Sequence, residues 1–148
     1  MERVKIIYQI MEDYKFIYVV SSYGGEYECS WENIECAFRT RSIANNWIKN
    51  RKKLAESIGK DKFKEIEGFI HKKEDEIYRK YYNEDTDELL EGKSDKDYLS
   101  ENNRFHDIEK FALIKDEFGI DKKTYDILCQ IFDDGFCDYS VKKTKLYN

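Results

Sequence analysis

Hydrophobic and polar residues alternate at both ends of the chain, which is the pattern of β-strands with one buried face. Residues 4–10 and 14–20 predict an antiparallel hairpin, and Gly24-Gly25 predicts a turn into a third strand over 27–38, with a slip at Glu32-Asn33. After Gly135 the alternation returns through Phe136, Cys137, Tyr139 and Val141. This last strand is expected to join the N-terminal sheet.

Between these strands, apolar residues recur every three or four positions, which predicts amphipathic helices. The first helix is capped by Thr40 or Ser42 and ends at Gly59. The second is capped by Asp61 and continues to about Tyr82. Two more are expected, one near 103–118 closed by Gly119 and one capped by Asp121, with Tyr125, Leu128, Ile131 and Phe132 on its buried side.

Residues 83–101 contain few apolar side chains and predict a loop with at most one short helix. Strands at the two ends with helices between them predict an α+β fold. We expect an antiparallel sheet of three N-terminal strands plus a C-terminal strand, packed against three to four helices. The 148 residues then form a single domain with a helical insertion at about 60–135.

Length and composition predict a soluble protein with one hydrophobic core. The chain has 12 Tyr, 9 Phe and 2 Trp to fill that core, and no apolar run long enough to span a membrane. Met1 is followed by charged residues rather than by a signal-peptide pattern. We therefore expect a cytoplasmic protein, in the host cell if it is phage-encoded, that has no membrane partner.

The residue types of common catalytic and metal sites are sparse. The spacing of Cys29, Cys36, Cys129 and Cys137 matches no metal motif, and all four are expected to be reduced and buried. His71 and His106 each lack a second ligand one helical turn away. No phosphate-binding glycine motif is present. We predict no cofactor, no metal and no catalytic residue, with a nuclease or nucleotide-modifying enzyme as an alternative.

Charge is distributed unevenly. Residues 39–82 carry 13 basic and 7 acidic groups, whereas 83–101 carry 2 basic and 8 acidic groups. Tyrosines at the end of a helix next to a run of carboxylates are typical of a protein interface, and they can mimic the bases and phosphates of nucleic acid. The predicted partner-binding residues are Tyr78, Tyr81, Tyr82, Glu84, Asp85, Asp87, Glu88 and Glu91.

A basic cluster gives a second alternative, direct binding of nucleic acid or a nucleotide. Its residues lie around the joint of the first two predicted helices: Lys49, Arg51, Lys52, Lys53 and Lys60. A solvated helix surface is the preferred explanation of this cluster, because the net charge is −5 and no recognised nucleic-acid-binding motif accompanies it.

The segment 37–48, AFRTRSIANNWI, follows a predicted hairpin and third strand and resembles the packing motif of small α+β proteins of bacteria and their phages. The proline-free composition, rich in Lys, Glu, Tyr and Ile, resembles accessory proteins of phages, including anti-CRISPR and other anti-defence inhibitors. This resemblance implies a non-catalytic protein that inhibits a host defence or nucleic-acid-processing protein. Its expected partner is a host protein with a basic surface, and an open sheet edge could also support an oligomer.

Overall fold

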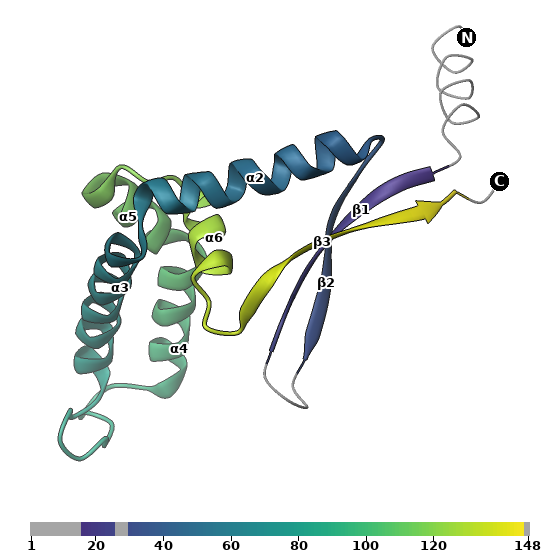
Figure 1. The fold of residues 1–148 in the computed structure, drawn as a ribbon. Helices are drawn as coiled ribbons and strands as arrows, with labels where there is room; N and C mark the ends of the chain where they lie inside the picture. The colour runs from purple at the N-terminus through teal and green to yellow at the C-terminus, as the bar shows by residue number, and fades with distance from the viewer. Residues whose placement is uncertain (1–15, 26–29, 147–148) are drawn as a thin grey trace, which may run out of the picture. The chain divides into compact units, whose positions relative to one another are not determined.

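The computed structural model describes residues 16–25 and 30–146 (Figure 1). Its elements, in chain order, are β1 (Phe16–Gly24), β2 (Trp31–Phe38), α2 (Arg41–Ile58), α3 (Lys60–Tyr81), α4 (Asp95–Arg104), the π-helical turn η2 (Phe105–Glu109), α5 (Lys110–Phe118), α6 (Lys122–Ile131) and β3 (Phe136–Lys145).

The three described strands form one antiparallel sheet in the order β2-β1-β3, so the C-terminal strand pairs with the first described strand. This confirms the α+β class and the predicted return of the last strand. The strand predicted over 4–10 lies outside the described residues. β2 has one register shift, but the predicted position at Glu32-Asn33 was wrong, because those residues pair regularly with Tyr23 and Ser22. The shift lies opposite Val20/Ser21, whose partners are Cys36 and Ile34, so Glu35 is the extra residue.

Contacts divide the chain into two compact units. The sheet unit comprises residues 1–57 and 129–148, and the helical unit comprises 58–128. The helical unit overlaps the insertion expected at about 60–135 and ends before it, at Leu128.

In the sheet unit, α2 supplies the apolar residues that cover one face of the sheet. Ala44 is fully buried with Val20 and Tyr139, and the Trp47 ring packs edge-on against Tyr139 with 5.7 Å between ring centroids. The start of α2 is capped as predicted, because Thr40 Oγ1 accepts a hydrogen bond from Ile43 N at 3.2 Å.

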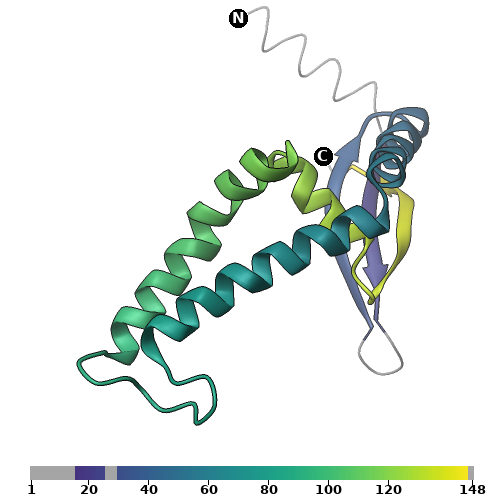
Figure 2. The same ribbon diagram turned by 90° about the vertical axis from the view of Figure 1, so that its left-hand side faces the viewer.

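In the helical unit, α3 runs beside α4 and α5, and the chain between α3 and α4 forms the loop at one end (Figure 2). The buried face of α3 consists of Phe63, Ile66, Ile70 and Ile77. Asp61 lies in the first turn of α3 and is not its cap, since Gly59 precedes the helix with φ 90°. Gly119 ends α5 with φ 69°, as predicted.

The helix expected from Asn103 begins eight residues earlier, at Asp95, where Ser94 caps it. The first part of this helix was not predicted because α4 is mostly polar and none of its residues is completely buried. The π-helical turn follows, with Lys110 N donating to Phe105 O. Phe105 and Ile114 are both buried but nine positions apart, which an uninterrupted α-helix would place on opposite sides. The extra residue of the π-helical turn brings them toward one side.

Two other sequence expectations concern burial and the membrane. Cys137 is exposed and Cys36 and Cys129 are half-buried, so the expectation of buried thiols was wrong for these three, and Cys29 lies outside the described residues. Cys137 is the residue at the register shift of β3. Within the described residues, no helix combines the length and the apolar character that crossing a bilayer requires.

Candidate functional site: the acidic loop of the helical unit

The loop after α3 has a backbone fixed by its own hydrogen bonds. Asn83 N donates to Glu88 O and Leu90 N donates to Tyr81 O, each at 2.8 Å, and Tyr82 and Leu89 form an isolated β-bridge. Asn83 Oδ1 also accepts from the amides of Asp85 and Thr86. The ordered backbone was not predicted, because the segment is mostly polar and its apolar pair Leu89-Leu90 is short.

Four tyrosines pack against one another where the loop meets the helices. The Tyr78 and Tyr82 rings are stacked at 4.9 Å, and the Tyr98 ring of α4 lies edge-on to Tyr82 at 5.2 Å. Tyr98 also contacts Tyr81. All four rings are half-buried. Tyr98 was not predicted as a site residue, because no sequence pattern indicates that α4 places its ring beside the end of α3.

Three of these phenols donate hydrogen bonds to carboxylates of the helical unit. Tyr78 Oη lies 2.5 Å from Asp87 Oδ1, and Tyr82 donates to Asp95. In each case, the hydrogen bond to the carboxylate, with smaller contributions from desolvation and charge, raises the pKa of the tyrosine to about 12. The rings therefore hold the loop in place, and Asp87, at φ 56°, is held by Tyr78.

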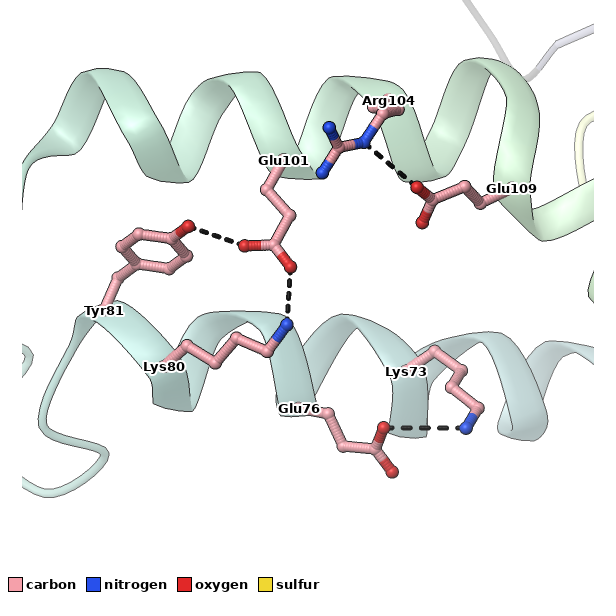
Figure 3. A network of polar contacts seen from close by, with 7 residues as sticks. All are labelled: Lys73, Glu76, Lys80, Tyr81, Glu101, Arg104 and Glu109. Atoms are coloured by element: carbon pink, nitrogen blue, oxygen red, sulfur yellow. Dashed lines mark hydrogen bonds and ion pairs between the residues drawn. The ribbon is translucent and has the colours of Figure 1, made fainter.

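The third phenol belongs to a bridge between α3 and α4 (Figure 3). Glu101 accepts from Lys80 Nζ and from Tyr81 Oη, both at 2.6 Å. These two hydrogen bonds, that of Lys80 first, lower the pKa of the Glu101 carboxyl. Figure 3 also shows Lys73 with Glu76 and Arg104 with Glu109, which are pairs within one helical segment.

The five predicted carboxylates of the loop are all exposed. Glu84 is paired with Arg79 at 3.0 Å, and Asp87 is bound by Tyr78. Asp85, Glu88 and Glu91 form no ion pair with any residue of the described chain. The apolar side chains beside them, Leu89 and Leu90, are 41% and 36% exposed. The loop thus presents three uncompensated carboxylates next to two exposed leucines.

The basic residues named as an alternative site are divided by the structure. Arg51 donates to Tyr139 Oη and Gln130 Oε1, and Lys52 pairs with Asp138 at 2.5 Å, so both are engaged within the sheet unit. Lys49 and Lys53 are exposed on α2. Lys60 begins α3 in the helical unit.

The two histidines considered for enzyme chemistry lie near the same carboxylate. His71 and His106 both approach Glu74, at 3.8 and 3.9 Å. Across residues 16–25 and 30–146, no three His, Cys, Asp or Glu side chains gather in a way that could hold a metal ion. Burial raises the pKa of the Cys36 thiol, with Glu35 adding to the effect, which disfavours a reactive thiolate there.

Comparison of the chain with protein-family models, with curated proteins and with solved structures found no match.

Proposed function

We propose that this chain is a non-catalytic binding protein, and that its acidic loop docks on a basic surface of a partner protein. The observation that carries the proposal is the exposure of Asp85, Glu88 and Glu91, none of which is paired with a cation among the described residues, on a loop with a hydrogen-bonded backbone. Charges held in a fixed arrangement bind with a smaller ordering cost than charges on a disordered tail.

The surroundings of these carboxylates support a protein partner. Leu89 and Leu90 offer apolar contact area on the same loop as the charges, and protein interfaces combine these two kinds of group. The charges speed association with a surface of opposite sign and select among partners. The tyrosines contribute by supporting the loop, because their hydroxyls are occupied by Asp87, Asp95 and Glu101.

The finer proposal is that the partner is a bacterial defence or nucleic-acid-processing protein, which the acidic loop inhibits by covering a basic, nucleic-acid-binding surface. The carboxylates then occupy positions that phosphates fill in the natural complex. The composition typical of phage accessory proteins motivates this choice of partner.

The test is affinity capture from a bacterial lysate, followed by identification of the captured proteins. The loop variant is D85S/E88S/E91S, and its control is E67S/D75S/D116S, which removes three exposed carboxylates from elsewhere in the helical unit. We expect the wild type and the control to capture the same basic partner in a salt-sensitive manner and the loop variant to lose it. Equal capture by the loop variant would refute the proposal.

The inhibitory role is tested on the captured protein itself. If that protein binds or cleaves nucleic acid, adding the wild type at equimolar amounts is expected to reduce its activity, whereas the loop variant leaves the activity unchanged. If the nucleic-acid activity of the partner is unaffected, this chain is a binding protein and the proposed inhibitory role is refuted.

A further inference from the structure

One end of the sheet carries cations that are held by aromatic rings rather than by carboxylates. Arg41 Cζ lies 5.1 Å from the centre of the Tyr18 ring, and Lys143 Nζ lies 4.2 Å from that of Phe16. Lys143 and Lys145 are the β3 partners of Tyr18 and Phe16 in the ladder. We call these five residues the basic sheet end.

The five residues come together through the strand pairing. Tyr18 and Phe16 are two positions apart on β1, so their side chains point to the same face, and Lys143 and Lys145 are spaced in the same way on β3. The beginning of β1 and the end of β3 lie side by side in Figure 1. Arg41 joins them at the start of α2, directly after β2.

The charge of this surface is not compensated within the described chain. Residues 16–25, 36–55 and 139–146 contain no Asp or Glu. Arg41, Lys143 and Lys145 are exposed, and none of the three forms an ion pair with a described residue. A cation over an aromatic ring keeps its full positive charge and its outward N–H donors, unlike Lys52, which Asp138 neutralises.

We propose that the basic sheet end binds the backbone of a single-stranded nucleic acid. Three neighbouring strands span about 10 Å, which corresponds to about three phosphates of one strand. Cations beside exposed ring surface are the combination that single-strand binders use, since phosphates contact the cations and unpaired bases stack on the rings. Phe16, at 36% exposed, is the ring that a base can reach. An acidic peptide would use the cations but not the rings.

This site goes beyond the proposed function and does not depend on it. The acidic loop belongs to the helical unit, the basic sheet end belongs to the sheet unit, and the variants that test them share no residue. The basic sheet end also shares no residue with the basic cluster named from the sequence, which consists of Lys49, Arg51, Lys52, Lys53 and Lys60.

The test measures fluorescence anisotropy of a labelled 20-nucleotide oligo-dT with the full chain between 50 and 200 mM NaCl. With about three phosphate contacts, log K is expected to fall with log salt at a slope near −2. The variant K143Q/K145Q is expected to bind at least tenfold more weakly at 50 mM NaCl, with a slope reduced by about 1.4. The control K72Q/K123Q removes two exposed charges from the helical unit and is expected to bind like the wild type.

Two further measurements separate nucleic acid from other polyanions. F16L is expected to weaken oligo-dT binding about fivefold and to leave binding of a 20-base-pair duplex unchanged, because stacking requires an unpaired base. Circular dichroism checks that each variant is folded. Absence of binding at 50 mM NaCl, equal loss in the control, or competition by poly-glutamate as strong as that by unlabelled oligo-dT would each overturn the proposal.

Discussion

Gln130 on α6 donates its side-chain amide to Glu35 on β2, with Nε2 and Oε1 2.5 Å apart. The carbonyl oxygen of the same amide accepts from Arg51 Nη2 at 2.7 Å and from the hydroxyl of Tyr139. One neutral side chain therefore connects a half-buried cation and a half-buried carboxylate. Ser22, which is fully buried, supplies the second hydrogen bond to Glu35.

Replacing this amide is expected to destabilise the sheet unit. Gln130→Leu leaves Glu35 with the hydrogen bond from Ser22 alone, and it removes the closer of the two acceptors of Arg51. Because hydrogen bonds to charged groups are lost, the free energy of unfolding is expected to fall by about 1.5–3 kcal/mol. Urea denaturation measures the change in the free energy of unfolding. Lys123→Leu, at an exposed position of the same helix, is the control and is expected to stay within about 0.5 kcal/mol of the wild type. Equal effects of the two substitutions would contradict the role of Gln130.

Two Gly→Ala substitutions are expected to change stability in opposite directions. A Cβ atom at Gly24 would lie 1.9 Å from Gly135 O, at a backbone contact where Gly25 N donates to that same oxygen, so G24A costs about 1–3 kcal/mol or more. A Cβ atom at Gly68 in α3 meets nothing within 4 Å, and G68A gains about 0.5–1 kcal/mol. Thermal or urea unfolding measures both changes. A gain of stability in G24A would show that this close contact is absent.

The π-helical turn is expected to tolerate loss of its extra residue. Deleting Ile108, which is 67% exposed, converts the turn to α-helix and keeps Phe105 and Ile114 near one side, so the loss should be within about 1 kcal/mol. Deleting Asn103 instead rotates Tyr98 by about 100° relative to Phe105 and breaks the tyrosine contacts. Urea unfolding of the two deletion variants is the measurement. A larger loss in the Ile108 deletion would refute this account.

The pKa values of two tyrosines are expected to lie about two units above the ordinary tyrosine pKa of about 10. Absorbance at 295 nm follows the phenolates, and Tyr78 and Tyr82 should ionise near pH 12, since their carboxylate partners disfavour the charged phenol. Because the folded pKa is raised, these bonds stabilise the fold fully below about pH 10 and lose their effect as pH rises to about 12. The substitution D87N should lower the pKa of Tyr78 toward 10, whereas the neighbouring control D85N should leave that pKa unchanged. Identical titration curves for the two variants would contradict the assignment.

The local elements were predictable because their signals are local. The 3–4 spacing of apolar residues placed α2 and α3, and Gly119 and Asp121 marked the turn between α5 and α6 correctly. The start of α4 was missed because eight of its ten residues are polar, and the adjacent pair Tyr98-Leu99 does not make a repeating apolar face. The π-helical turn could not be predicted, because the spacing of Phe105 and Ile114 becomes informative only once both residues are known to be buried.

The candidate surfaces were predictable to different degrees. Sequence alone located the acidic residues of the loop, because a block of charge is a property of composition. It did not indicate that Asp87 and Asp95 accept hydrogen bonds from tyrosines. Nor did it indicate that Asp85, Glu88 and Glu91 form no ion pair with a described residue. The basic sheet end was not foreseen, since Phe16, Arg41 and Lys143 are far apart along the chain.

The sequence by itself determined the secondary-structure class and the two blocks of opposite charge, because periodicity and composition act over a few residues. Only the tertiary structure decided which charges are neutralised and which face solvent. The pairing of β1 with β3 sets Lys143 beside Tyr18, and the packing of α3 with α4 sets Lys80 beside Glu101. The physical reason is that charge compensation depends on distances of a few ångströms between residues separated by tens of positions in the chain.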